Sequence, residues 1–146
     1  MQIAALDWSG ELRGGGRTKI WSALADDGRL TDLVNGRSRE EIADYLIALG
    51  DESPDLVIGL DFAFSMPEWF VRHKGAATGK AHLKKFETRV EHPDLLAIAS
   101  SSEDAFDAAV SAIVMSRCLD DLGALPPADA VDKIEGRIWK PVGALR

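Results

Sequence analysis

Apolar runs and alternating segments in the first part of the chain predict three β-strands. Residues 2–7 form an aliphatic run that is too short for a helix and ends in an acid. Residues 18–25 and 29–34 are also strand-like, and Asp26-Asp27-Gly28 between them is a strong hairpin signal. These segments therefore predict an antiparallel meander.

The next stretch predicts a helix followed by a fourth strand. Ser38-Arg39-Glu40-Glu41 has the form of a capping box, and apolar residues at helical spacing follow as far as Gly50, where the helix should stop. Residues 55–61 are apolar without alternation, which favours a strand buried on both faces. This order is a crossover connection, which can place the fourth strand beside the first and parallel to it.

The second half of the chain is mainly helical in pattern. Two short helices are expected over residues 67–74 and 81–91. Residues 95–99 fit either a strand or a helix. The longest helix should be capped by Ser100 or Ser101 and run to about residue 122, and residues 136–139 are a candidate for a last edge strand.

Composition indicates one globular domain, 1–146, in a reducing compartment. The chain has 146 residues, 46% of them hydrophobic, and one cysteine, Cys118, in an apolar helical run that favours a buried, inert thiol. No apolar run reaches the length of a membrane span, and the start lacks the features of a signal peptide, so we expect a cytoplasmic protein. A net charge of −7 argues against binding nucleic acid by bulk charge, although bound cations reverse the sign locally.

Four aspartates form the constellation that carries chemistry. If the first and fourth strands are parallel neighbours, Asp7 and Asp61 end them at one edge of the sheet, where α/β sheets usually bind ligands. Asp104 and Asp107 share a face at the start of the long helix, and the alanines after them let that helix approach the sheet. Carboxylates gathered in this way take up a proton or bind a hard cation such as Mg²⁺ or Mn²⁺. The pattern favours a two-metal site for phosphoryl transfer.

Each acid also has a purely structural explanation. Asp104 in the first turn of a helix is a favourable dipole partner, and Asp7 after a strand can be a turn residue. Gly14 to Gly16 lack the spacing and the lysine of a phosphate-binding loop. The three histidines have no zinc-site spacing. A basic segment is either a solvated helix face or a phosphate grip, and it comprises Arg72, Lys74, Lys80, Lys84, Lys85 and Arg89.

Five stretches of the chain resemble a domain family of unknown function whose members are described as predicted nucleases of RNase-H-like fold. They are ALDWSG, GRSREEIADYLI, PDLVIGLDFAFSMPEWF, SEDAFDAAVSAIVMSR and EGRIWKP. The resemblance implies an RNase-H-like mixed sheet of strand order 3-2-1-4-5 and a metal-dependent acidic site like that of RuvC-type resolvases. It assigns that site to Asp7, Asp61, Asp104 and Asp107.

The chain departs from this family in its shortened middle. Only residues 71–100 separate the stretch ending at Phe70 from the last helix, so the fifth strand is doubtful unless residues 95–99 supply it. An open edge at the fourth strand would need to be covered or paired, which makes a homodimer that pairs or exchanges elements an expected arrangement.

Three functions follow as hypotheses. The first is a nuclease dependent on Mg²⁺ or Mn²⁺, in which Asp7 bridges the ions, Asp61 holds one side and the two helix acids hold the other. The second is a non-catalytic RNase-H-like binding or assembly module, favoured by the acidic charge and the shortened middle. The third is a nucleotide-binding phosphotransfer relative, because the actin-like ATPases share this sheet and a similar first loop. The substrate of the first, DNA or RNA, stays open.

Overall fold

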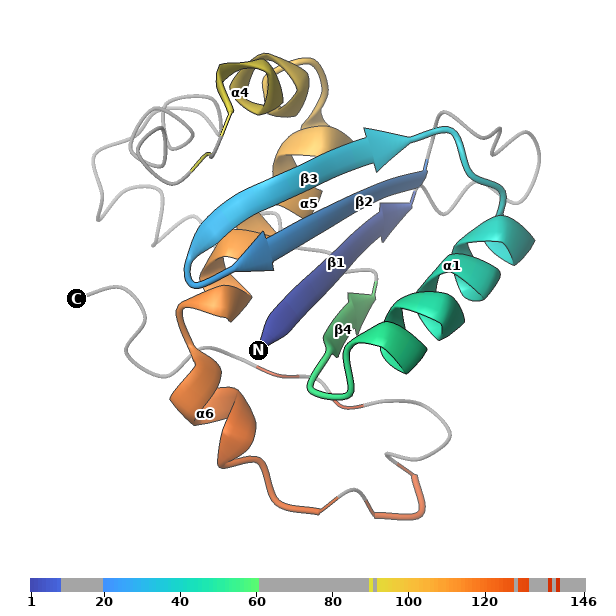
Figure 1. Cartoon of the computed structure of the whole chain (residues 1–146), viewed down its shortest axis with the longest axis vertical. Helices are drawn as coiled ribbons and strands as arrows, with labels where there is room; N and C mark the ends of the chain where they lie inside the picture. The colour runs from blue at the N-terminus through green and yellow to red at the C-terminus, as the bar shows by residue number, and fades with distance from the viewer. Residues whose placement is uncertain are drawn as a thin grey trace.

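A four-stranded mixed sheet has helices on both of its faces (Figure 1). This computed structural model describes residues 1–8, 20–60, 90, 92–127, 129–131, 137 and 139, with only the backbone of Trp8. The strands are β1 (Gln2–Trp8), β2 (Ile20–Asp26), β3 (Arg29–Asn35) and β4 (Val57–Leu60). The helices are α1 (Arg39–Glu52), α4 (Pro93–Ala99), α5 (Glu103–Ser116) and α6 (Leu119–Gly123). The α/β class and the predicted order β3-β2-β1-β4 are confirmed for this part of the chain.

The predicted meander is present, and a tight turn fixes its hairpin. β1 pairs antiparallel with β2, and β2 pairs antiparallel with β3. Asp27 and Gly28 both have positive φ, 45° and 73°, as a type I′ turn requires. The Asp27 N–H donates to the Asp26 carboxylate at 3.1 Å, which helps an aspartate to hold this conformation.

The capping box at Ser38 is confirmed, but the predicted end of α1 at Gly50 is wrong. The Glu41 N–H donates to Ser38 Oγ, and the Ser38 N–H donates to the Glu41 carboxylate at 2.7 Å. The helix continues to Glu52, and the Ser53 N–H closes it by donating to the Leu49 carbonyl. Pro54 explains this end, because a proline excludes the helical conformation at the residue before it, whereas a single glycine only weakens a helix.

β4 pairs parallel with β1, as the crossover predicts, from Ile3 opposite Val57 to Leu6 opposite Leu60. The expectation that this strand is buried on both faces is wrong. Gly59 is buried, but Ile58 and Leu60 are 40% and 52% exposed. Val57 packs on the α5 side, whereas α1 packs its buried residues against β1 and β2 and leaves the α1-facing side chains of β4 open.

The main core lies between the sheet and α5, which crosses β1, β2 and β3. Small residues line the buried side of this helix, so its backbone approaches the strands closely. These residues are Ala105, Ala108, Ala109 and Ala112, each at most 1% exposed. A second cluster on the other face joins α1 to β1 and β2 through Leu6, Ile20 and Ile42. The sheet is thus held between two apolar layers.

The single long helix predicted up to residue 122 is two helices, α5 and α6, and its cap is Ser102 rather than Ser100 or Ser101. Ser102 Oγ accepts from the Ala105 N–H at 3.1 Å. At the other end, the Ser116 hydroxyl donates to the Ile113 carbonyl at 2.9 Å, a local bond that competes with the helical ladder. Residues 95–99, ambiguous in the sequence, lie in helix α4.

Several predictions concern segments outside the described residues, including the helix at 67–74 and most of the one at 81–91. Val90, at the end of the latter, forms an isolated parallel bridge with Leu30. Arg137 and Trp139 are not in a strand, so the described part of 136–139 does not support the edge strand. None of the helices in the described part of the chain is long and apolar enough to cross a membrane.

Candidate functional site

The alternation of β1 directs Asp7 toward α5. Ile3 and Ala5, at positions of the same parity, belong to the clusters that pack against this helix. Asp7 continues that row and is half-buried, and its cross-strand partner is Trp21, which is itself buried. A carboxylate therefore lies where an apolar residue would continue the core.

The second acid of the site comes from the start of α5. Ser102 caps the helix, so Glu103 and Asp104 occupy the first turn and Asp107 follows one turn later. Phe106 and Ala108, on either side of Asp107 in the sequence, are buried against the sheet. Asp107 is half-buried as a result, and it shares a helix face with Asp104.

The structure brings Asp7 and Asp107 into electrostatic contact. The pKa of Asp107 is raised from 3.8 to about 6, mainly because burial disfavours the charged carboxylate. The negative charges of Asp7, Glu103 and Asp104 raise the pKa further, in that order. Around neutral pH several negative charges therefore surround the half-buried carboxylate of Asp107.

Such a cluster can relieve its repulsion by retaining a proton or by accepting a cation. Its donors are all carboxylate oxygens, the ligand type preferred by hard divalent ions such as Mg²⁺ and Mn²⁺. A bound cation would stabilise the ionised form of Asp107 in the same place where burial and neighbouring charges disfavour it. The donor type of these residues therefore suits a divalent metal ion.

Other predicted residues lie outside the part of the chain that the structure describes. Asp61 lies outside the described residues, as does the whole basic segment between residues 72 and 89. Within the described part of the chain, no three His, Cys, Asp or Glu side chains are arranged to hold a metal ion. Of the four predicted acids, the structure describes Asp7, Asp104 and Asp107, and the charges of Asp7 and Asp104 act on Asp107.

Sequence reasoning overlooked two charged residues at this end of the sheet. Glu103, in the first turn of α5, acts on Asp107. Arg37 lies between β3 and α1. Both residues lie near the carboxyl ends of β1 and β3, where side chains of different elements meet. This position could have identified them as candidates.

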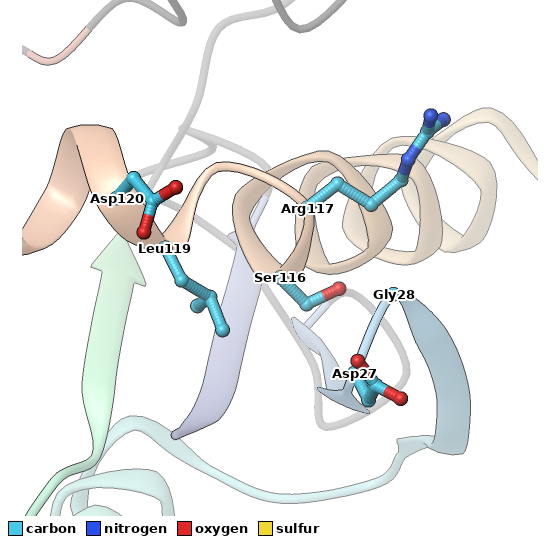
Figure 2. A pocket seen from close by; sticks show the side chains of 6 residues that line it. All are labelled: Asp27, Gly28, Ser116, Arg117, Leu119 and Asp120. Carbon is cyan, nitrogen blue, oxygen red and sulfur yellow. The ribbon is translucent and has the colours of Figure 1, made fainter.

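A hollow of about 330 Å³ lies at the opposite end of the sheet, between the hairpin turn and the α5–α6 junction. Figure 2 shows Ser116 directed toward Gly28, while the carboxylates of Asp27 and Asp120 lie on opposite sides and do not converge. Cys118, close to this hollow in the chain, is buried, and burial raises the pKa of its thiol, consistent with the predicted inert cysteine. We find no chemistry there comparable to the acidic cluster.

Fold and site together define an α/β protein with an acidic cluster at the carboxyl end of its first strand. Comparison with protein-family models, with curated proteins and with solved structures finds no match to the chain.

Proposed function

We propose that the protein is a metal-dependent phosphodiester hydrolase acting on nucleic acid, with an RNase-H-like fold. The observation that carries the proposal is the pair formed by Asp7 and Asp107, from a strand end and a helix, in which burial and then the charge of Asp7 raise the pKa of Asp107. Perturbed carboxylates of this kind cluster at functional sites. The strand order β3-β2-β1-β4 also agrees with the first four strands of the order 3-2-1-4-5 that the proposed fold implies.

In this proposal four acids hold Mg²⁺ or Mn²⁺. Asp7 and Asp107 supply the central carboxylates, Asp104 adds a third from the same helix face, and Asp61 adds one from the end of the fourth strand. The chemistry that such ions supply when bound is the activation of water and the stabilisation of the leaving oxygen of a phosphodiester. The protein's own task is to fix the carboxylates on rigid elements and to exclude water from part of their surface.

The packing of α5 performs this task. The alanines on its buried side hold the helix close to β1 and β2, and the Ser102 cap fixes where its first turn begins. Asp107 is therefore positioned by the core and not by a flexible loop. A rigid helix is a better support for metal ligands than a loop, because small displacements weaken coordination.

A second candidate is a non-catalytic assembly module. Ile58 and Leu60 are exposed on β4, which has no strand on its other side within the described residues. An edge of this kind pairs readily with another chain. In that case Asp7 and Asp107 would bind no ion, and a homodimer through β4 would be the functional form.

The experiment that separates the two candidates is a cleavage assay with Mn²⁺ on single-stranded, double-stranded and branched DNA and on RNA. The wild type should cleave at least one of them, and Asp7→Asn should lose the activity while its circular dichroism stays native. Asp55→Asn, a matched change at the other end of β1, should retain it. A folded wild type that cleaves none of these substrates would favour the assembly module.

A further inference from the structure

Arg37 is half-buried, and no carboxylate among the residues that the structure describes forms an ion pair with it. It follows Gly36, whose φ of +102° redirects the chain between β3 and α1. The ion pairs within the described part of the chain do not include it, although the protein has an excess of acids. Arginines in an acidic protein normally find such partners, because a guanidinium is always charged and costly to desolvate alone.

Two neighbours hold the guanidinium in place. Its Nη1 donates to Ser22 Oγ at 3.4 Å, and its Cζ lies 4.1 Å from the centre of the Tyr45 ring. Ser22 is only 3% exposed, and its own hydroxyl donates to the Val34 carbonyl at 3.5 Å. One face of the guanidinium is thus stacked and one N–H is used, and among the described residues no further acceptor takes its other donors.

Among the described residues, two carboxylates lie near the Tyr45–Arg37 pair without forming an ion pair with Arg37. Burial raises the pKa of Tyr45, the Arg37 charge lowers it, and Asp32 and Glu52 raise it at longer range. The Asp32 carboxylate accepts from the Leu33 N–H at 2.9 Å and does not approach Arg37 within ion-pair distance. A guanidinium that is held in place and has further N–H donors can bind an anion.

The position of Arg37 relates it to the acidic site. Ser22, under the guanidinium, pairs with Leu6, and the next row of the sheet contains Asp7, Trp21 and Asn35. Because side chains alternate along a strand, Ser22 and Arg37 lie on the α1 side, whereas Asp7 faces α5. The cation and the acids therefore flank the same end of the sheet from opposite faces.

We propose that Arg37 binds a backbone phosphate of the nucleic-acid strand whose scissile bond lies at Asp7 and Asp107. This inference rests on the proposed function for the substrate class. The phosphate in contact with Arg37 is a different one from the phosphate that reacts, because the two sites lie on opposite faces. Arg37 is therefore a residue for substrate affinity, not a catalytic residue.

The test measures binding of a fluorescein-labelled oligodeoxythymidylate by anisotropy, with Ca²⁺ present so that the strand stays intact, over a range of salt concentrations. Arg37→Ala should weaken binding roughly three- to tenfold and reduce the slope of log affinity against log salt by about 0.7, as expected for one lost phosphate contact on a single strand. Arg29→Ala is the matched control, because Arg29 is exposed at the hairpin, at the far end of the sheet.

Two further variants separate phosphate binding from packing. Arg37→Gln removes the charge but keeps a planar polar group on the side chain, and it should bind as weakly as Arg37→Ala, whereas Arg37→Lys should recover part of the affinity. Equal binding by Arg37→Gln and Arg29→Ala, or no binding by the wild type, overturns the role of Arg37. In a cleavage assay Arg37→Gln should raise KM and leave kcat nearly unchanged. If binding depends on Arg37 but no cleavage occurs, the proposed hydrolase function is refuted and the proposed phosphate contact is supported.

Discussion

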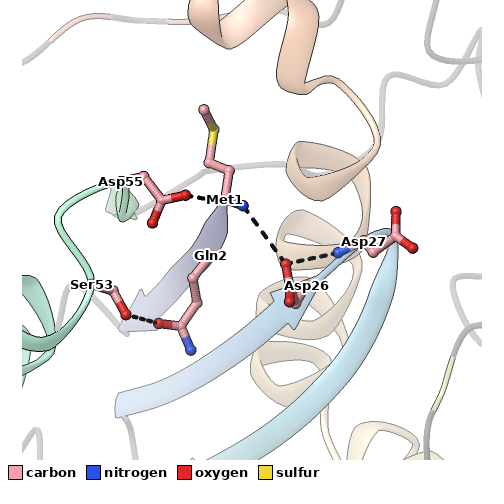
Figure 3. A network of polar contacts seen from close by, with 6 residues as sticks. All are labelled: Met1, Gln2, Asp26, Asp27, Ser53 and Asp55. Atoms are coloured by element: carbon pink, nitrogen blue, oxygen red, sulfur yellow. Dashed lines mark hydrogen bonds and ion pairs between the residues drawn. The ribbon is translucent and has the colours of Figure 1, made fainter.

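Carboxylates lie near both ends of β1, but their surroundings differ. At its start, Asp55 and Asp26 lie 3.1 and 4.0 Å from the amino group of Met1, and their side chains are 63% and 62% exposed (Figure 3). At its end, Asp7 and Asp107 are half-buried and act on each other as like charges. In the first arrangement exposed carboxylates lie beside a cation, whereas in the second burial and neighbouring negative charges raise the pKa of Asp107.

The candidate site is therefore distinguished by the burial and the like charges around Asp107, not by the number of acids. Next to the amino group of Met1, Ser53 Oγ donates to the Gln2 side chain at 2.9 Å, so the start of the strand is also well supplied with polar partners. Asp120 of α6 and the two acids of the hairpin turn, Asp26 and Asp27, are likewise exposed. Asp107 is the carboxylate for which burial and like charge combine.

The largest expected effect is the response of thermal stability to Mn²⁺. A ligand at about a hundred times its dissociation constant stabilises the folded state by about 2.7 kcal/mol, or roughly 10 °C in Tm for a chain of this size. We expect this increase in the wild type and in Asp120→Asn, and its loss in Asp107→Asn. Differential scanning fluorimetry with and without Mn²⁺ measures it. An equal increase in Tm in all three proteins would show that Asp107 is not part of the metal site.

The next effect concerns stability without metal. A pKa raised from 3.8 to about 6 corresponds to about 3 kcal/mol if unscreened, and solvent screening of a half-buried group reduces this to about 1 kcal/mol. Between about pH 4 and 6 the folded chain holds more protons on Asp107 than the unfolded chain, so this carboxyl makes the protein less stable as the pH rises through that window.

Asp107→Asn should therefore be more stable than the wild type at pH 7, by about 1 kcal/mol, and the difference should vanish near pH 4. Urea unfolding at the two pH values measures it. Asp120→Asn, on an exposed helix position, serves as the control and should show no such difference. A variant that is less stable than the wild type at pH 7 would mean that Asp107 stabilises the fold.

A smaller effect is the coupling between the two acids. Asp7→Asn removes the largest of the like charges acting on Asp107, so the pKa of Asp107 should fall while staying above its ordinary value, because burial persists. Carboxyl carbon chemical shifts followed by NMR across the titration report this pKa directly. Asp55→Asn should leave the titration of Asp107 unchanged. Identical titration in wild type and Asp7→Asn would show that the two carboxylates are not neighbours.

The smallest expected effect is on the exposed pair at the start of β1. Asp55→Asn should leave Tm unchanged within error at physiological salt, because exposed ion pairs are screened and contribute little. A scan of this variant beside the wild type tests it. A clear fall in Tm would show that the polar network at Met1 stabilises the sheet, and the contrast between the two ends of the strand would weaken.

Much of the sheet could be predicted because local signals were strong. The hairpin at Asp27-Gly28 and the capping box at Ser38 each specify their element by backbone chemistry, and the crossover then fixes β4 beside β1. The errors arose where local signals compete with context. Gly50 did not end α1 because Pro54 did, and Ser116 interrupted a helix whose apolar pattern continues.

The candidate site was partly predictable for the same reason. A strand that ends in Asp7 and a helix that begins near Asp107 meet at one edge of the sheet, so their proximity follows from topology. The exposure of Ile58 and Leu60 could not be foreseen, because an apolar strand without alternation gives no sign of which face a helix leaves open. The stacking of Arg37 on Tyr45 depends on packing between β3 and α1 that no local pattern specifies.

The most direct test of the acidic cluster as a metal site is calorimetric titration of Mn²⁺ into the wild type, Asp7→Asn and Asp55→Asn, with folding of each checked by circular dichroism. Binding of one or two ions by the wild type and by Asp55→Asn, with loss of binding in folded Asp7→Asn, is the predicted result. Equal binding by Asp7→Asn, or no binding by the wild type, would contradict a metal site at the end of β1.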